Sequence, residues 1–320
     1  MNISVHSEVT QVRYQDFSKN VWPSWMISLG EKTMKAYLDC IPCFLRQSLE
    51  AARMTTNDEA VHVKVIREVM NHLRSISFNN TPPELSREVH NIVRKVTNSK
   101  DPYKKVKNQS NEMIKKLYPH LKKLVEEADD PLFMAVKLSI IGNVIDFGTS
   151  TRFSIEDMID NIAEKEFEDH AYPKFKKTLD RSKTILYLAD NAGEIFFDKL
   201  LLEEISKYDK DITFVVKANP IINDATMEDA EFAGVDKLAT IIEGDAGQEC
   251  STPGIVLAYS TKELLGKIYS TDMMISKGQG NYESLSDIKR EVFFMLVVKC
   301  PLVAQDIGEE MSKLILKVKE

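Results

Sequence analysis

The chain has 320 residues, of which 28% are charged and 43% hydrophobic, and its formal net charge is −7 with neutral histidines. This mild acidity argues against nucleic acid as the main partner, because phosphate backbones select basic surfaces. Four cysteines are too few for a disulfide scaffold and favour a reducing, cytoplasmic location. No apolar run approaches the roughly 20 residues that cross a bilayer, so we expect no membrane partner.

The first 180 residues divide into two segments. Residues 1–33 are polar and weakly periodic. Either Met34 is the natural start and these residues are a mis-called extension, or they form a flexible arm. From 34 to 180 apolar residues recur three and four apart, and Pro83 and Pro131 suit the first turn of a helix. The pattern predicts a helical N-terminal domain over residues 34–180.

From 181 to 320, apolar strand-like runs alternate with helical runs. The expected strands cover 184–189, 212–218, 238–243, 272–276 and 292–298. The expected helices lie near 195–207, 226–233, 255–259 with 261–266, and 284–289. Such alternation implies parallel strands with right-handed crossovers. The sequence therefore predicts an α/β fold, with a doubly wound, mainly parallel sheet beside the helical N-terminal domain.

Polar residues follow the first expected strand, where a helix then begins. Asp190, Asn191 and Glu194 surround one glycine, Gly193. In open α/β sheets the carboxyl ends of strands face the crevice that binds ligands. A single glycine does not make a phosphate-cradling loop, whereas carboxylate and amide oxygens suit Mg²⁺ or Mn²⁺. The alternative is that Asp190 and Asn191 cap the next helix.

Two further polar clusters follow later strands. Asp224 lies beyond the expected strand 212–218, where it can supply a third oxygen ligand or, alternatively, cap the following helix. The other cluster consists of Lys277, Gly278, Gln279, Gly280 and Asn281. Its glycines let backbone N–H groups approach an oxyanion while the ammonium adds charge, although a flexible turn is the alternative.

Three more polar residues are candidates for the same site. Asn143 and Asp146 interrupt an otherwise apolar helix and share one of its faces. Because burying them without partners is costly, we expect them to line a pocket facing the α/β domain. The alternative is that they bond the end of their own helix before Gly148. Lys299, at the end of the expected strand 292–298, is a weaker candidate, since a lone lysine is usually a surface residue.

The remaining motifs, and the motifs that are missing, exclude several classes of protein. Cys40 and Cys43 form a lone CxxC, and no second pair with zinc-ligand spacing exists. A redox pair would lack the strand that precedes it in thioredoxin-like folds, so packing at a helix start is the simpler interpretation. The absence of GxSxG, Walker and GxGxxG motifs argues against serine hydrolases, P-loop NTPases and common dinucleotide dehydrogenases.

Taken in order, the motifs resemble those of one family. They are Cys40-x-x-Cys43, Gly142-Asn143-x-x-Asp146, Asp190-Asn191-Ala192-Gly193-Glu194, Asn223-Asp224 and Lys277-Gly-x-Gly-Asn281. Over roughly residues 34–310 the chain resembles the metal-dependent damage-control phosphatases, once classed as a domain of unknown function. Within that family it looks most like the microbial branch that bears a CxxC.

The resemblance implies a fold, a cofactor and ligands. The fold is an α/β domain with a helical N-terminal part. The cofactor is a divalent metal, Mn²⁺, Ni²⁺, Co²⁺ or Mg²⁺, held by Asp190, Asn191 and Asp224. The segment from Lys277 to Asn281 is implied to contact the substrate phosphate. Some relatives carry Arg-Thr-x-Lys before the last helix, and this chain departs there because it retains only Lys299.

We therefore predict a phosphatase that hydrolyses small phosphomonoesters, either sugar phosphates or damaged phosphometabolites, by metal-activated water. Asp190 would be central to catalysis, and Lys277 with the Gly278 and Gly280 backbone would neutralise the phosphoryl group. The remaining candidates are Asn281 and Lys299 for substrate binding, Asn143 and Asp146 for orienting water or the leaving group, and Glu194 either as a base or as a residue that supports the metal ligands. One alternative is a methyl or other group transferase, and another is a non-enzymatic metal- or nucleotide-binding module with a CxxC redox switch. The sequence does not predict an oligomeric state.

Overall fold

The structure is a computed structural model, and it describes residues 34–143, 159, 167, 170–246 and 249–319. Residues 34–320 make up one compact unit, and the segment 1–33 lies outside the described residues. The helices are α1 (Cys40–Thr55), α2 (Glu59–Leu73), α3 (Pro82–Thr97), α4 (Lys104–Glu126), α5 (Pro131–Ile141), α7 (Tyr172–Arg181), α8 (Glu194–Ser206), α9 (Met227–Ala233), α10 (Lys262–Ser270), α11 (Gln279–Leu285) and α12 (Pro301–Ile307). The strands are β1 (Thr184–Leu188), β2 (Asp211–Val216), β3 (Thr240–Glu243), β4 (Met273–Lys277), β5 (Val292–Val297) and β6 (Leu314–Lys319).

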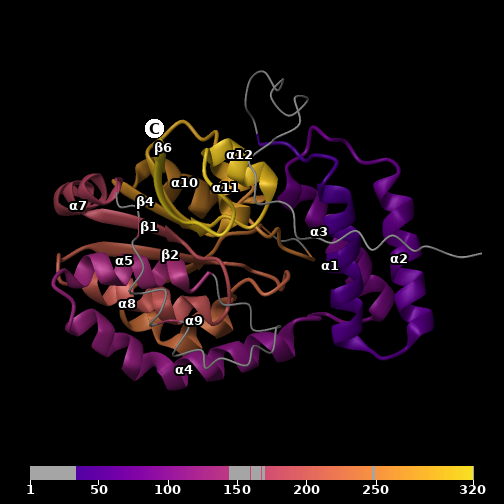
Figure 1. Ribbon diagram of the computed structural model, residues 1–320, viewed down its shortest axis with the longest axis horizontal. Coiled ribbons are helices and arrows are strands. Elements are labelled where there is room, and N and C mark those ends of the chain that lie inside the picture. Colours follow the sequence, from indigo (N-terminus) through magenta and orange to yellow (C-terminus); the bar gives the residue numbers. More distant parts are fainter. Residues whose placement is uncertain (1–33, 144–158, 160–166, 168–169, 247–248, 320) are drawn as a thin grey trace, which may run out of the picture. The chain divides into compact units, whose positions relative to one another are not determined.

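The strands form one six-stranded sheet in the order β3-β2-β1-β4-β5-β6 (Figure 1). All neighbouring pairs from β3 to β5 are parallel, and only β6 runs antiparallel to its neighbour β5. From β1 the chain winds outward to β2 and β3 on one side, and later from β4 to β5 on the other. The prediction of a doubly wound, mainly parallel α/β sheet is confirmed.

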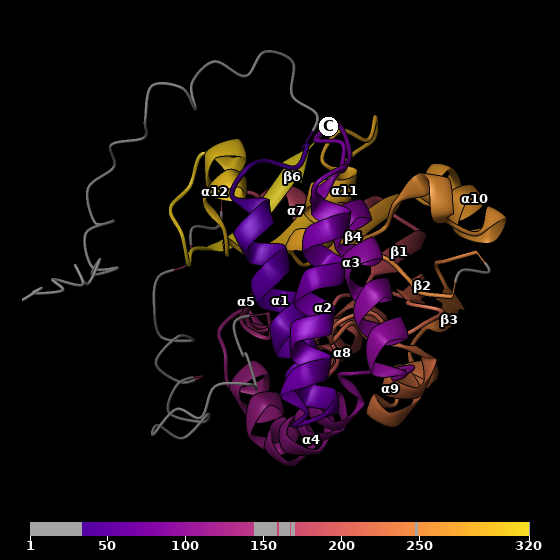
Figure 2. The ribbon, with the colours of Figure 1, turned by 90° about the vertical axis from the view of Figure 1, so that its right-hand side faces the viewer.

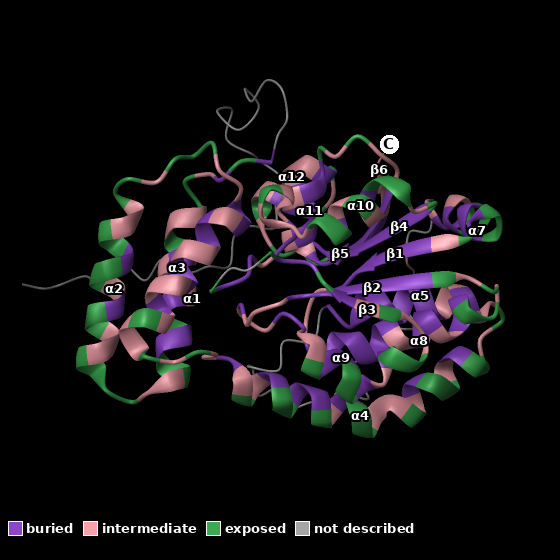
Figure 3. Cartoon of the chain, turned by 180° about the vertical axis from the view of Figure 1, so that it is seen from behind, coloured by how far each residue is buried: buried purple, intermediate pink, exposed green. Residues whose placement is uncertain are grey.

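Alternate side chains of the strands enter two separate cores, one on each face of the sheet. Tyr187 of β1 stacks on Phe214 of β2 in the core that includes residues of α4, α5, α7, α8 and α9. Leu186 and Leu188 of the same strand enter the other core, with residues of α10, α11 and α12. Helices therefore cover both faces, and the strands are buried along most of their length (Figures 1 and 3). Burial on both faces explains why the strands read as continuous apolar runs.

The first three helices pack on one another around a smaller core of their own (Figure 2). Val65 and Val69 of α2 and Val89 and Val93 of α3 are fully buried there, at the four-residue spacing of a helix face. The α3 helix starts with a capping box at Thr81, a feature that satisfies free N–H groups at a helix start. Local sequence thus accounts well for this part of the chain.

The remaining N-terminal helices belong to the core of the sheet. Buried residues of α4, α5 and α7 lie in the same cluster as the strands, so that core runs across the predicted boundary at residue 180. The α3 helix reaches the α/β part through Arg87, whose Nε donates to the Cys250 carbonyl at 3.1 Å. Among the described residues, no helix is long and apolar enough to span a membrane.

Several expected element boundaries are wrong. The α5 helix ends at Ile141, and Gly142 and Asn143 form a turn, so Asn143 is not inside a continuous apolar helix. The helix expected near 284–289 instead starts at Gln279, because Gly278 adopts a positive φ of 79° that sends the chain directly into α11. Neither α12 nor the edge strand β6 was expected. Asp146 and Gly148 lie outside the described residues.

Candidate functional site

The candidate site lies where the strand order reverses, between β1 and β4, which is the usual ligand position in doubly wound sheets. Asp190 follows β1, and Gly278 follows β4. The two residues are in direct contact, since a Cβ atom added to Gly278 would lie 2.0 Å from Asp190 Oδ2. Gly278 therefore has to be glycine, both for its φ and for the carboxylate beside it.

The side-chain amides of two asparagines connect two predicted site carboxylates, those of Asp190 and Glu194. Asn191 Nδ2 donates to Asp190 Oδ2 at 2.7 Å and to Glu194 Oε2 at 2.9 Å. Asn143 Nδ2 donates to the same two oxygens, at 2.8 and 2.9 Å. The turn after α5 and the loop after β1 thus meet at one cluster. As predicted, Asn143 lies beside Asp190 and Glu194 of the α/β part. The role of these residues in the reaction remains a prediction.

Asp224 is brought to the same place by the backbone. Asn191 and Asp224 form an antiparallel bridge, and the Ala225 N–H donates to the Asp190 carbonyl at 2.8 Å. The alternative that Asp224 caps the next helix is wrong, because α9 is capped by Thr226. Capping of α8 by Asp190 or Asn191 is wrong as well, because its N-cap is Gly193, which has no side chain to cap the helix. These polar side chains are therefore not explained by the helices that follow them.

One carboxylate oxygen of Asp224 is buried without a hydrogen-bond partner in the described part of the chain. Its side chain is only 4% exposed, and its Oδ2 has no hydrogen-bond partner among the described residues. The nearest charge is the Lys217 ammonium, 3.7 Å from Oδ2. Burial raises the pKa of Asp224 well above its usual value, and the Lys217 charge only partly opposes the rise. A buried carboxylate oxygen of this kind needs a cation or a proton.

The Lys277 ammonium is held in a different, fully buried cluster. It donates to the Ser139 carbonyl at 2.8 Å, to Glu194 Oε1 at 2.7 Å and to Asp198 Oδ1 at 2.5 Å. Asp198 Oδ1 also accepts bonds from the Tyr187 and Ser139 hydroxyls, both at 2.8 Å. An ammonium has three N–H donors, and all three are used by the protein. The geometry favours a positioning role for Lys277 over the direct phosphate contact that we expected.

The same contacts set the ionisation of the three carboxyl groups. Burial and the neighbouring Glu194 charge raise the pKa of Asp190 to about 7. Burial also disfavours ionisation of Glu194, but the Lys277 ammonium outweighs it and lowers the pKa of that carboxyl. Burial raises the pKa of Asp198 to about 6, although the positive charge of Lys277 opposes this rise. Glu194 is thus the carboxyl group whose pKa the protein lowers, which makes it a weaker base than the sequence suggested.

Other predicted substrate contacts have structural partners instead. Asn281 is buried, its Nδ2 donates to the carbonyls of Ala189 and Lys277, and its Oδ1 accepts from the Ile255 N–H at 2.8 Å. It therefore ties the ends of β1 and β4 together. Gly280 lies in the first turn of α11, where an added Cβ would be 1.8 Å from the Pro253 carbonyl oxygen, so packing alone requires glycine there.

Lys299 remains near the site but is not built into it. Its side chain is exposed, and its backbone N–H donates to Gln279 Oε1 at 3.0 Å. Its charge contributes to lowering the pKa of Asp190, after the larger opposing effects of burial and Glu194. Lys299 is thus placed to attract an anion, but no bond from its ammonium to another described residue fixes it.

Three functional candidates were missed by sequence reasoning. Asp198 lies four residues after Glu194, so a second carboxylate on the same helix face was a readable signal. Lys217 directly follows β2 and is 2% exposed. Asn111 of α4 accepts a 2.7 Å bond from the Gly193 N–H and donates to Asp229, which fixes the loop after β1. No local pattern marks Asn111, because its partners are more than eighty residues away.

The side chains around Asp190 suit a hard divalent cation. Asp190, Asn191 and Asp224 offer two carboxylates and an amide, and the Asp224 oxygen without a bond is one that a cation would satisfy. Among the described residues, no three His, Cys, Asp or Glu side chains gather as a metal-binding group. The predicted ligands Asp190, Asn191 and Asp224 do not form such a group, because one of the three is an asparagine.

The cysteines do not form a second metal group in the part of the chain that the structure describes. Cys40 and Cys43 lie in the first turn of α1 and are free thiols, as is Cys300. Burial raises the pKa of Cys40 to about 11 and also raises the pKa of Cys43 above its usual value. Since the thiolate is the reactive form, neither thiol is activated for redox chemistry, which disfavours a CxxC switch.

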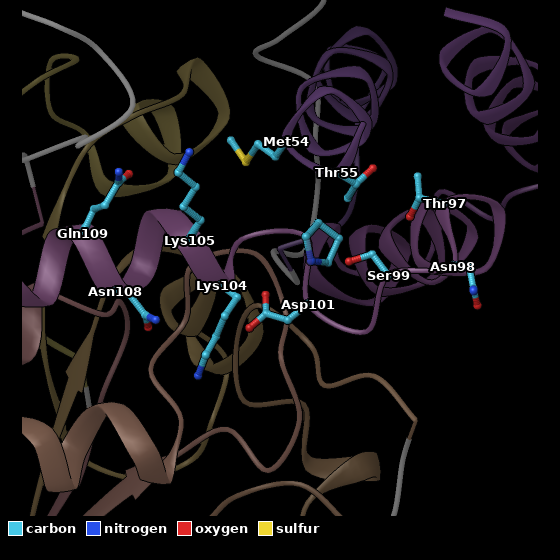
Figure 4. A pocket seen from close by; sticks show the side chains of 11 residues that line it. Met54, Thr55, Thr97, Asn98, Ser99, Asp101, Lys104, Lys105, Asn108 and Gln109 are labelled. Atoms are coloured by element: carbon cyan, nitrogen blue, oxygen red, sulfur yellow. The ribbon is translucent and has the colours of Figure 1, made fainter. Parts of the chain in front are cut away.

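A hollow of about 700 Å³ lies away from this cluster, where α1 and α3 end and α4 begins (Figure 4). It contains none of the predicted site residues. Its lining residues are Met54, Thr55, Thr97, Asn98, Ser99, Asp101, Pro102, Lys104, Lys105, Asn108 and Gln109. The chemistry we expect therefore depends on the buried cluster around Asp190, whereas the hollow is lined mainly by surface polar groups.

Replacing Gly278 by alanine tests the contact with Asp190. The variant would combine a strained backbone with a Cβ inside the carboxylate, and we expect a loss of roughly 1–3 kcal/mol in the free energy of unfolding. We also expect Asp190 to be displaced and activity to fall by about 100-fold or more. Gly266→Ala is the matched control, because an added Cβ in α10 meets no atom within 4 Å. Equal behaviour of the two variants in urea unfolding would contradict the assigned contact.

The architecture and this cluster define a doubly wound α/β protein with an oxygen-rich site at the switch point of its sheet. The chain belongs to the family of the damage-control phosphatase ARMT1-like domain, whose family model matches residues 36–315. Membership places it among proteins that act in the repair of phosphorylated metabolites.

Individual relatives agree with the family model. A damage-control phosphatase of Archaeoglobus fulgidus is 34% identical, with 88% of this chain and 98% of the relative covered. A damage-control phosphatase of Pyrococcus horikoshii is 33% identical, with 86% and 94% covered. An uncharacterized protein of Methanocaldococcus jannaschii is 36% identical, with 89% and 96% covered.

A solved structure shares the fold. The crystal structure of a DUF89 family protein from Pyrococcus horikoshii superimposes with a TM-score of 0.82 at 29% identity. The match covers 89% of this chain and 99% of that chain. The helical N-terminal part and the sheet are therefore arranged as in this known family member.

Proposed function

We propose that this protein is a metal-dependent phosphatase that hydrolyses small phosphomonoesters such as sugar phosphates or damaged phosphometabolites. The observation that carries the proposal is the buried Asp224 oxygen without a hydrogen bond, bridged through the backbone to Asn191 and Asp190. Membership of the damage-control phosphatase family supports the reaction class. The resemblance of the motifs to those of metal-dependent relatives supports metal dependence.

Asp190, Asn191 and Asp224 would hold the cation, which we expect to be Mn²⁺, Ni²⁺, Co²⁺ or Mg²⁺. When bound, such a cation supplies positive charge at a phosphoryl oxygen and lowers the pKa of water. Its binding would replace the proton that the raised pKa of Asp224 favours. Hydrolysis of a phosphomonoester is very slow without catalysis, so this concentration of charge would provide most of the rate enhancement.

The protein's own contribution is positioning. Asn143 and Asn191 hold Asp190 and Glu194 at fixed distances, so the charged oxygens need not rearrange during the reaction. Lys277 keeps Glu194 ionised and thereby keeps it an acceptor for both amides. Glu194 is therefore assigned as a positioning residue, which is one of the two roles that the sequence suggested.

The test is phosphate release from a panel of sugar phosphates and other phosphometabolites by the chelator-treated full chain. We expect release only after Mn²⁺, Ni²⁺, Co²⁺ or Mg²⁺ is added back, and we expect no dependence on a methyl or other group donor. Turnover that requires such a donor would indicate a transferase. Tight binding of metal and phosphosugar with no turnover across the panel would indicate a sensing module and would overturn the proposal.

A further inference from the structure

Lys217 is a buried cation that lacks a hydrogen bond. Its residue is 2% exposed, and its Nζ atom has no hydrogen-bond partner among the described residues. Asp224 Oδ2 lies 3.7 Å from this Nζ atom, beyond hydrogen-bond range. Leaving an ammonium buried in this way is costly, because each lost bond to water has to be replaced. The position therefore calls for an acceptor that the described residues do not supply.

Two other buried lysines, Lys277 and Lys107, have acceptors among the described residues. Lys277 makes three bonds of 2.8 Å or less. Lys107 donates to Asp229 Oδ2 at 3.1 Å and lies 3.5 Å from Asp101 Oδ2. The fold thus satisfies a buried ammonium where the role is structural. Lys217 departs from that pattern, and it does so at the edge of the sheet where the candidate site lies.

The backbone fixes Lys217 beside the predicted cation ligands. Its N–H donates to the Ala225 carbonyl at 2.9 Å, and Ala225 in turn donates to the Asp190 carbonyl. The residue is therefore locked next to Asp224 at the carboxyl end of β2. Its ammonium lies 3.7 Å from Asp224 Oδ2, and the Asp224 backbone is bridged to Asn191, the neighbour of Asp190.

We propose that Lys217 is the ammonium that receives the phosphoryl group of the substrate, donating a hydrogen bond to a phosphoryl oxygen beside Asp224. This inference rests on the proposed phosphatase function. Lys277 is unsuited to the task because all three of its donors are used, and Lys299 is exposed. A phosphate dianion is the acceptor that fits, since it carries charge and several free oxygens, and a cation on Asp224 would draw that carboxylate away from Lys217.

The experiment measures binding of inorganic phosphate to the Mn²⁺-loaded full chain by calorimetry, and Mn²⁺ binding separately. We expect Lys217→Met to weaken phosphate binding by about 10- to 100-fold, because a charge-assisted bond is lost. Mn²⁺ affinity should stay the same or rise, since a neighbouring positive charge is removed. Lys217→Arg should retain most of the phosphate affinity. Lys207→Met, an exposed lysine at the end of α8, is the matched control and should match the wild type.

A role limited to pairing with Asp224 would give the opposite pattern. Lys217→Met would then change Mn²⁺ affinity or unfolding temperature and leave the phosphate Kd unaltered, which would overturn the proposal. If Lys217→Met does not fold, the wild-type chain with ¹⁵N-labelled lysine replaces it. Phosphate should then shift a lysine Nζ resonance that is missing in Lys217→Arg, and an unshifted resonance would refute the contact. Because the probe is inorganic phosphate, the result does not depend on finding the metabolite that the enzyme hydrolyses.

Discussion

Asp224→Asn is expected to abolish Mn²⁺ binding and to lower kcat/KM by about 1000-fold or more. The substitution keeps the shape of the side chain but removes the buried charge that has no hydrogen-bond partner among the described residues. Losing one charged ligand out of two carboxylates removes much of the attraction for a divalent cation, and with it the charge that stabilises the transferring phosphoryl group. Calorimetric titration with Mn²⁺ and phosphate-release kinetics together measure both effects.

A thermal measurement separates loss of binding from loss of folding. Mn²⁺ at about 100 times its Kd should stabilise the wild type by about 2.7 kcal/mol and leave the Asp224→Asn variant unaffected. Asp236→Asn, at an exposed position, is the matched control and should retain the metal-dependent stabilisation. Asp190→Ala should behave like Asp224→Asn. Normal Mn²⁺ uptake by either variant would show that the proposed ligand set is wrong.

Lys277→Met is expected to lower the free energy of unfolding by about 3–5 kcal/mol, because it leaves two buried carboxylates without their counter-ion. Those carboxylates are Glu194, which is 1% exposed, and Asp198, which is fully buried. With the ammonium gone, the two acids would repel each other and the amide contacts to Glu194 would loosen. Urea unfolding of the full chain measures the stability, and phosphate release measures the accompanying loss of activity.

A second substitution distinguishes positioning from direct phosphate contact. Lys277→Met combined with Asp198→Asn removes one of the stranded charges, so it should recover a substantial part of the lost stability. A lysine that only bound phosphate would behave differently: its removal would leave the unfolding curve unchanged and raise KM. Finding that pattern in Lys277→Met would restore the direct contact that the sequence suggested.

Local sequence was enough to predict most of the scaffold. The apolar runs that became β1, β2 and β4 are buried on both faces of the sheet, and their parallel pairing follows from the helices between them. Boundaries failed where a distant partner decides them. The edge strand β6 exists because it pairs antiparallel with β5, and the start of α11 depends on the positive φ of Gly278.

The candidate site, like the fold, could be predicted from the sequence only in part. Because parallel strands present their carboxyl ends at one edge, sequence alone could place Asp190, Asn191 and Asp224 together, and the Asn191–Asp224 bridge agrees. Sequence could not tell which way a lysine points. Lys277 and Lys217 both end up buried beside carboxylates near this edge, yet one has three acceptors and the other has no hydrogen bond among the described residues.

The sequence by itself therefore determined the α/β architecture and the oxygen-rich segments at its switch point, because both follow from periodicity and from where strands end. The tertiary structure alone decided which charges are neutralised within the protein. That outcome depends on contacts such as Lys277 with Ser139, made between residues 138 positions apart, and on burial that no short stretch of sequence encodes.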